Sequence, residues 1–211
     1  MTTTGSATPS SFAKFDEHMV LRRLAVFCGS KLGSKPVFGE AASALGAAMA
    51  SRCIDLVYGG AANGLMGLVA SAALDGGASA IGVIPRGLAR QEFAHPRLTQ
   101  SHVVESMHER KAMMSELADG YVALPGGFGT MDELFEALTW AQVGLHAKPI
   151  GLLNVDGFYD PLIEWVQRGL DDGFIPSVLS TALVVEKEPL VLIDRLQTHQ
   201  PPRSAVTWLR Q

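Results

Sequence analysis

Short apolar runs alternate with longer helical patterns along almost the whole chain, and this alternation limits the fold more than any other feature. Seven runs are rich in β-branched or other apolar residues, and helical patterns fill most of the intervals between them. Strands that are apolar throughout are typical of a parallel sheet with helices on both faces. With right-handed crossovers, the pattern predicts an α/β fold with a three-layer, doubly wound, Rossmann-like parallel sheet.

The strands are expected at Leu24–Cys28, Ile54–Tyr58, Ala80–Ile84, His102–Glu105, Tyr121–Leu124, Pro149–Asn154 and Ala182–Val185. The helices are expected near Pro36–Arg52, Gly64–Gly76, Met107–Asp119, Thr130–Val143, Tyr159–Asp172 and Pro189–Gln197. The segment Pro85–Ser101 has few periodic apolar positions and is expected to be a long surface loop. Ligands of such sheets bind at the carboxyl ends of the strands, so the segments that follow the strands are the places to search for a site.

Composition fits a single globular domain. The chain has 211 residues, of which 47% are hydrophobic and 18% charged, and its net charge of −4 gives no bulk attraction to nucleic acid or to an anionic membrane. Residues 1–18 are rich in Ser and Thr and predict a disordered tail, and residues 19–211 predict one nucleotide-binding domain. Without a secretion signal or a membrane-length apolar run, the protein is expected to be cytoplasmic. Cys28 and Cys53 are expected to be reduced core residues.

Three of the expected strands are followed by glycine-rich turns: CGSKLG from Cys28, GGAANG from Gly59, and PGGFGT from Pro125. Glycine allows a sharp turn and a close approach of a ligand to backbone amides. The helix that follows presents free N–H groups and a partial positive charge, which together favour phosphate. One such turn is usually plain strand-to-helix geometry, but three at one edge of the sheet favour a nucleotide site.

Well-known fingerprints do not match these turns. The first lacks the GxGxxG spacing of a dinucleotide site, and the second has Leu65 and Met66 where a Walker A loop has Lys and Ser or Thr. These mismatches disfavour a hydride-transfer enzyme and a phosphate-transferring ATPase. The six histidines show no ligand spacing, so no metal is expected.

Charged residues accompany the third turn and the helix start at MHERKAMM. Glu133 and Glu136 lie three residues apart and share a helix face. A structural role at the helix N-terminus is enough to explain Glu136. Glu133 lies one turn from Thr130, within reach of a sugar whose phosphate binds there. Arg110 and Lys111 oppose the dipole of their own helix start, which favours a ligand-related role over a merely solvated face.

Together, MHERKAMM, LPGGFGTMDE and LTWAQVGLHAKPIGLLN resemble the LOG family, the cytokinin riboside 5′-monophosphate phosphoribohydrolases that are often mislabelled lysine decarboxylases. The resemblance extends from about Leu24 to Val185. It implies that Arg110 and Glu133 are catalytic, that no cofactor is needed, that the substrate is an AMP-like nucleoside 5′-monophosphate, and that the protein is a homodimer. The apolar helix Leu134–Leu145 is either part of the dimer interface or part of the core.

The family pattern also implies a set of substrate-binding residues. The PGGxGTxxE turn matches from Pro125 to Glu133 without exception, the glutamate after the VIP strand matches Glu92, and the Thr before the Trp matches Thr139. Lys31 and Ala61 depart from the usual first and second turns. The implied set is Gly29, Ser30, Gly59, Gly60, Glu92, Met107, Lys111, Gly126, Gly127, Phe128, Gly129, Thr130, Met131, Asp132 and Thr139.

The expected reaction is hydrolysis of the N-glycosidic bond of an adenosine 5′-monophosphate, with or without an N6 substituent. By analogy with glycosidases, Glu133 would stabilise or trap the ribosyl cation and activate water, and Arg110 would counter the negative charge that develops. A decarboxylase would need a lysine bound to pyridoxal phosphate, and Lys148 is expected to be a surface residue instead. Two alternatives stay open: a non-catalytic nucleotide or molybdenum-cofactor carrier, and a general AMP nucleosidase.

Overall fold

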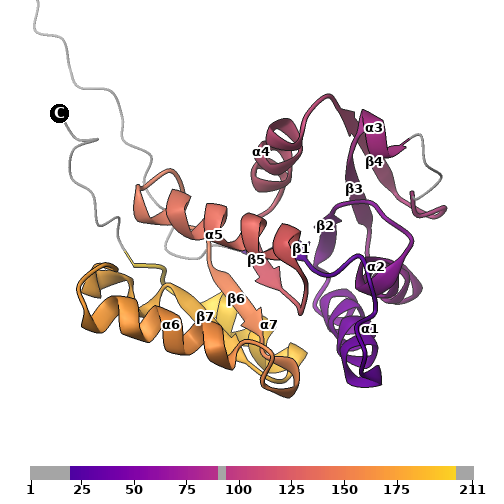
Figure 1. Cartoon of the computed structure of the whole chain (residues 1–211). Coiled ribbons are helices and arrows are strands. Elements are labelled where there is room, and N and C mark those ends of the chain that lie inside the picture. Colours follow the sequence, from indigo (N-terminus) through magenta and orange to yellow (C-terminus); the bar gives the residue numbers. More distant parts are fainter. Residues whose placement is uncertain (1–19, 90–93, 203–211) are drawn as a thin grey trace, which may run out of the picture.

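The computed structural model describes residues 20–89 and 94–202 (Figure 1). Seven strands and the helices between them follow one another in the order that the sequence predicts. The strands are β1 Arg23–Phe27, β2 Asp55–Tyr58, β3 Ala80–Pro85, β4 Gln100–Val104, β5 Gly120–Ala123, β6 Ile150–Leu153 and β7 Leu183–Glu186. The helices are α1 Pro36–Ser51, α2 Gly64–Asp75, α3 Arg86–Ala89, α4 Met107–Leu117, α5 Phe128–Gln142, α6 Asp160–Asp171 and α7 Pro189–Thr198, with short 3-10 helices at Val155–Gly157 and Ser177–Thr181.

All seven strands are parallel and lie in the order β4-β3-β2-β1-β5-β6-β7. The order reverses at β1: the chain first builds β2, β3 and β4 outward on one side, and then returns to place β5 on the other. Leu24 of β1 therefore pairs with Leu56 of β2 and with Gly120 of β5. A doubly wound sheet leaves a crevice at such a reversal, beyond the carboxyl ends of the strands.

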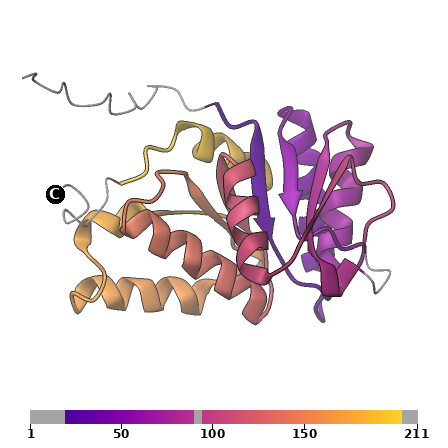
Figure 2. The same cartoon turned by 90° about the horizontal axis from the view of Figure 1, so that it is seen from above.

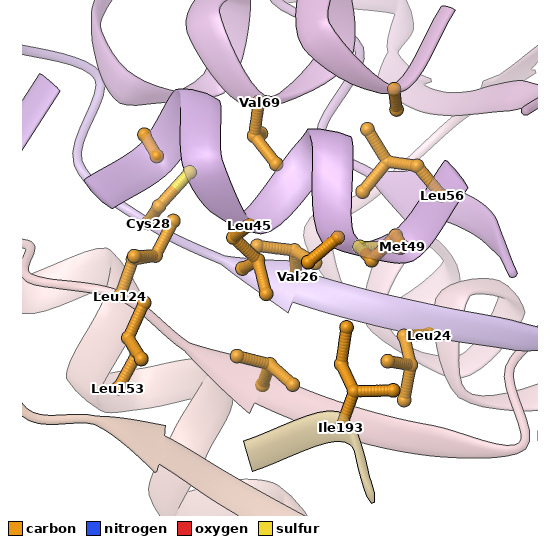
Figure 3. Close-up of a cluster of buried hydrophobic side chains, with 14 of the residues drawn as sticks. Leu24, Val26, Cys28, Leu45, Met49, Leu56, Val69, Leu124, Leu153 and Ile193 are labelled. Carbon is orange, nitrogen blue, oxygen red and sulfur yellow. The ribbon is translucent and has the colours of Figure 1, made fainter. Parts of the chain in front are cut away.

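Helices cover both faces of the sheet, which confirms the expected three-layer α/β fold (Figures 1 and 2). Helices α1, α2 and α7 pack on one face, where Leu45 and Met49 of α1 meet Val26 of β1 and Ile193 of α7 closes the cluster (Figure 3). Helices α4, α5 and α6 cover the other face. There α5 buries Leu134 in the core, so the apolar side of this helix is largely used within the chain.

Two sequence expectations need correction. The segment Pro85–Ser101 is not one long loop, because Pro85 ends β3, helix α3 follows, and β4 begins at Gln100. Cys28 is a buried free thiol as expected, but Cys53 is exposed. It occupies a left-handed position, φ 55°, in the tight turn from α1 to β2, and this turn faces solvent. The expected tail, residues 1–18, lies outside the described residues. In the described part of the chain, no helix is both long and apolar enough to cross a membrane.

Candidate active site

The three glycine-rich turns come together because strands β2, β1 and β5 are neighbours in the sheet. The N–H of Gly29 donates to the carbonyl oxygen of Pro125 over 3.0 Å. The N–H of Leu65 donates to the carbonyl oxygen of Gly29 over 3.1 Å. These hydrogen bonds tie the turn after β1 to the other two. Beside them lies a pocket of about 230 Å³, at the reversal point of the strand order. Its lining residues are Val26, Cys28, Gly29, Ser30, Gly59, Met66, Met107, Arg110, Gly127, Phe128, Gly129, Thr130, Asp132 and Glu133.

Helix α5 begins at this pocket without a side-chain cap. Gly127 is its N-cap residue and makes no side-chain hydrogen bond, and the N–H of Met131 is bonded to the carbonyl oxygen of Gly127 over 3.1 Å. The N–H groups of residues 128–130 therefore have no carbonyl partner within the helix. Together with the dipole of a 15-residue helix, they form an anion-binding position.

Two glycines are needed for this arrangement on steric grounds. A Cβ atom on Gly126 would lie 2.1 Å from Thr130 Oγ1, so a side chain there would displace the start of α5. Gly64, the first residue of α2, has φ +63°, and a Cβ atom on it would lie 2.3 Å from the carbonyl carbon of Ser30. Helix α2 also starts without a side-chain cap, after Asn63. Glycine thus brings the uncapped starts of two helices close to the turn after β1.

Arg110 of α4 and Glu133 of α5 form a buried ion pair on the wall of the pocket. Arg110 Nη2 lies 3.0 Å from Glu133 Oε1, and only 13% and 9% of the two side chains are exposed. Neither Glu133 Oε1 nor Arg110 Nε has a hydrogen-bond partner, so the two charges attract one another while part of their hydrogen-bonding capacity stays free. Buried polar atoms without partners are uncommon, and in a pocket they are available to a ligand.

Burial is the largest influence on the pKa values of the Glu133 carboxyl and the Cys28 thiol in this pocket. It raises the pKa of the Glu133 carboxyl above its usual range, and the nearby Arg110 guanidinium opposes that shift. Burial likewise raises the pKa of the Cys28 thiol, and the charge of Glu133 adds to the effect. Cys28 is therefore a neutral part of the pocket floor, and Glu133 is a carboxyl group that can take up a proton more readily than an ordinary glutamate.

The family model described as "Possible lysine decarboxylase" matches residues 66–196. The cytokinin riboside 5′-monophosphate phosphoribohydrolase LOG7 of Arabidopsis thaliana is 44% identical over 186 residues, which cover 88% of this chain and 86% of LOG7. The phosphoribohydrolase LOG of Oryza sativa subsp. japonica is 46% identical over 180 residues, 85% of this chain and 74% of that protein. This chain belongs to the LOG family.

Solved structures with the same fold include proteins that are named for binding or carrying the molybdenum cofactor. A molybdenum cofactor binding protein from Rippkaea orientalis superposes with a TM-score of 0.65 at 19% identity, over 85% of this chain and 98% of that chain. The molybdenum cofactor carrier protein of Chlamydomonas reinhardtii gives a TM-score of 0.62 at 21% identity, over 84% and 98%. At this level of identity the likeness extends to the Rossmann-like fold of this LOG-family chain and not to its site.

The residues of this LOG-family pocket do not suit the decarboxylase description. That chemistry requires a lysine that can form a Schiff base with pyridoxal phosphate, and no residue of the pocket lining is lysine. Lys111, predicted as a substrate-binding residue, lies outside the lining and is paired with Asp132 and Glu136. Lys148 is not the surface residue that the sequence suggested: it is half-buried, its Nζ donates to the carbonyl oxygen of Ser115, and burial lowers its pKa.

The structure places most of the predicted LOG-family site in the lining and a few of its members elsewhere. Arg110, Glu133 and nine of the predicted binding residues line the pocket: Gly29, Ser30, Gly59, Met107, Gly127, Phe128, Gly129, Thr130 and Asp132. Gly60, Gly126 and Met131 each adjoin a lining residue in the sequence but are not in the lining themselves, and Glu92 falls outside the described residues. Thr139 is exposed two turns further along α5, where its hydroxyl donates to the carbonyl oxygen of Phe135.

Three lining residues of the LOG-family pocket were not predicted. Val26 and Cys28 face it from the end of β1, and Met66 faces it from the first turn of α2. The signal for Cys28 was its position directly before Gly29, and for Val26 the two-residue period of a strand. Nothing in the sequence singles out Met66, because an apolar residue in a first turn is equally suited to the core. The described residues contain no group of three or more His, Cys, Asp or Glu side chains arranged to hold a metal ion.

Proposed function

We propose that this protein hydrolyses the N-glycosidic bond of N6-substituted adenosine 5′-monophosphates and releases the free base and ribose 5-phosphate. The observation that carries the proposal is the buried, incompletely hydrogen-bonded pair Arg110–Glu133, directly beside an uncapped helix start. A relative at 44% identity over 88% of the chain is named for this reaction on cytokinin riboside 5′-monophosphates.

The 5′-phosphate would bind where α5 begins. The free N–H groups at Phe128, Gly129 and Thr130 supply donors, and the helix dipole supplies a partial positive charge. Glu133 lies one turn further along the same helix, so a bound phosphate leaves the ribose beside its carboxylate. Binding energy at the phosphate would thereby position the sugar for a reaction one turn away.

The bond that breaks joins C1′ of the ribose to the base nitrogen. As it lengthens, positive charge develops on the ribose and negative charge on the base. The carboxylate of Glu133 stabilises the ribosyl cation and accepts a proton from the attacking water, whose oxygen bonds to C1′. The departing base nitrogen takes up one proton from solvent, and Glu133 releases to solvent the proton that it received from water, so the base leaves neutral and the carboxylate is regenerated. Arg110, whose guanidinium is largely buried, counters negative charge on the base or orients the sugar hydroxyls.

The open atoms of the pair suit these roles. Glu133 Oε1 has no hydrogen-bond partner and can accept from a ribose hydroxyl or from water, and Arg110 Nε has a free N–H. A raised pKa helps Glu133 to hold the proton it receives from water. A pure carrier needs the glycine turns but has no need of a buried acid beside them.

Base release measured by chromatography tests the proposal. The protein is incubated with isopentenyladenosine monophosphate, with AMP, and with isopentenyladenosine, which lacks the phosphate. The expected result is rapid release from the first compound and poor turnover of the nucleoside. Equal turnover of isopentenyladenosine and its monophosphate would contradict the phosphate-binding role of the turn. Tight binding without any base release would favour the carrier alternative, and a preference for AMP would favour a general nucleosidase.

The homodimer, the cytoplasmic location and the independence from a cofactor stay predictions of this proposal. Sedimentation of the purified protein measures the first directly: a mass of about twice the 22.4 kDa chain is expected. A monomer that is fully active would contradict the dimer and leave the proposed reaction untouched.

A further inference from the structure

Arg110 and Lys111 are neighbours in the sequence, but their side chains lie in different cavities. Successive residues of a helix point about 100° apart, so one of the pair faces the pocket and the other does not. Arg110 lines the pocket, whereas Lys111 lines a separate small cavity of about 10 Å³ between α4, α5 and the sheet. Glu133 lines both spaces, and therefore has Arg110 on one side and the Lys111 cavity on the other.

Lys111 is held by two carboxylates of α5. Its Nζ lies 2.7 Å from Glu136 Oε2 and 3.1 Å from Asp132 Oδ2, and only 12% of its side chain is exposed. Asp132 and Glu136 are four residues apart, so they flank Glu133 on neighbouring turns of the helix. Lys111 thus clamps the carboxylates on either side of the proposed catalytic one.

The clamp joins two helices whose backbones approach each other closely at few points. The ion pairs of Arg110 with Glu133, and of Lys111 with Asp132 and Glu136, cross from α4 to α5. Ser115 of α4 and Trp140 of α5 line the small cavity between them. These three ion pairs therefore link α4 to α5 beside the pocket, in addition to the apolar side chains that the two helices contribute to the core.

We infer that Lys111 is a positioning residue, which acts through Asp132 and Glu136 to keep Glu133 paired with Arg110 and aimed into the pocket. The inference rests on the proposed function for its kinetic consequences. Without Lys111, Arg110 would be the one cation of the described residues that faces the three carboxylates within two turns of α5. Like charges at that spacing repel, and Arg110 would be drawn toward Asp132 as well as Glu133.

The charges around Glu133 support this role. Burial raises the pKa of Glu133, Arg110 lowers it, Asp132 raises it, Lys111 lowers it and Glu136 raises it, while the buried Cys28 thiol faces it from β1. Loss of Lys111 removes one of the two cations and leaves both flanking carboxylates uncompensated. The pKa of Glu133 must then rise further, so a larger fraction of the protein carries a protonated Glu133 at neutral pH. Lys111 itself stays charged, because its bonds to Glu136 and Asp132 outweigh the effect of burial on its pKa.

The test compares Lys111→Met, Lys111→Arg and the wild type, with Lys187→Met at an exposed site as the matched control. Lys111→Met is expected to lower kcat about tenfold to a hundredfold, the scale of a misplacement of about 1 Å, and to leave KM within about threefold. Its acidic limb in the pH profile of kcat should move to higher pH. Lys111→Arg should restore most of the rate, and Lys187→Met should match the wild type.

A double variant separates charge from packing. In Lys111→Met/Glu136→Gln, one of the uncompensated carboxylates is gone, so the acidic limb should return toward its wild-type position. Glu136→Gln alone should keep most of the activity, because Asp132 still holds Lys111. If Lys111 instead bound the substrate directly, Lys111→Met would raise KM and leave the pH profile in place. That outcome, or a lowered Tm with unchanged kcat, would overturn the inference.

A readout independent of turnover keeps the inference apart from the proposed function. The titration of Glu133 can be followed by carbon-13 NMR of its carboxyl group in the wild type and in Lys111→Met. An upward shift of its pKa in the variant is expected whether or not the protein releases base. A wild type that releases no base would defeat the proposed function alone, whereas an unchanged Glu133 titration would defeat the role of Lys111.

Discussion

Arg110 Nη2 lies 3.0 Å from Glu133 Oε1, and neither that oxygen nor Arg110 Nε has a hydrogen-bond partner. A buried ion pair optimised for stability would satisfy both groups, because each unsatisfied polar atom in the interior costs free energy. Here the fold buries two charged side chains and leaves one polar atom of each without a hydrogen-bond partner. The pair therefore has the character of a ligand-binding element.

Glu133→Gln keeps the shape of the side chain and removes its charge. If the carboxylate meets the ribosyl cation, kcat should fall by about 10²–10⁴-fold, the usual contribution of a positioned acid or base. AMP should still bind, because the start of α5 is unchanged. Steady-state base release and calorimetry measure the two effects. Glu164→Gln, on the exposed side of α6, is the control, and near wild-type turnover of Glu133→Gln would show that another group performs the chemistry.

Gly59→Ala displaces Arg110 without touching either charged residue. The added Cβ atom would lie 2.4 Å from Arg110 Nη2 and 3.2 Å from Met66 Sδ, both at the far ends of flexible side chains. The guanidinium must move while the backbone stays, so we expect kcat to fall about tenfold or more with little change in Tm. Gly87→Ala, where an added Cβ meets no atom within 4 Å, is the control. Unchanged kcat in Gly59→Ala would mean that the position of Arg110 is unimportant.

His146 should make the stability of the protein sensitive to mild acid. Its Nε2 lies 3.0 Å from the carbonyl oxygen of Ala137, and its Nδ1 accepts from the N–H of Lys148, so the neutral ring donates through Nε2. Burial, with the nearby Lys148 charge, lowers the pKa of His146 to about 4. In the unfolded chain, the imidazole of His146 takes up its proton near pH 6.5.

Stability is therefore expected to fall as the pH drops from about 6.5 to about 4, since the unfolded state binds up to one more proton than the folded state. Urea unfolding at several pH values measures this. His146→Gln, which can still donate to Ala137, should show a flatter dependence over the same range. An equal slope in both proteins would assign the acid sensitivity to other groups.

Metal removal should leave the activity intact. The histidines lack ligand spacing, and the pocket lining offers only two carboxylates, one of them already paired with Arg110. Dialysis against EDTA followed by the base-release assay is the measurement. A loss of activity that Zn²⁺ or Mg²⁺ restores would show that a metal ion participates in the reaction.

Much of the architecture could be predicted from local sequence. Apolar runs such as Leu24–Cys28 and Tyr121–Leu124 could be recognised as strands, because strands of a sheet that is buried on both faces are apolar throughout. The structure pairs these two strands in parallel. The short helix α3 was missed, since four residues carry too little periodicity to be recognised. The half-buried position of Lys148 was missed as well, because its burial comes from Ser115 and Tyr121 of distant segments.

The sequence by itself determined the order of strands and helices, the glycine positions that make the turns possible, and, through its resemblance to the LOG family, the candidates Arg110 and Glu133. Only the tertiary structure decided which of the two neighbouring cations, Arg110 or Lys111, lines the pocket. Arg110 and Lys111 look equivalent in MHERKAMM, but the 100° step of the helix sends one to the pocket and the other to Asp132 and Glu136. Such a division depends on where α5 packs against α4, and that placement is set by contacts between segments far apart in the chain.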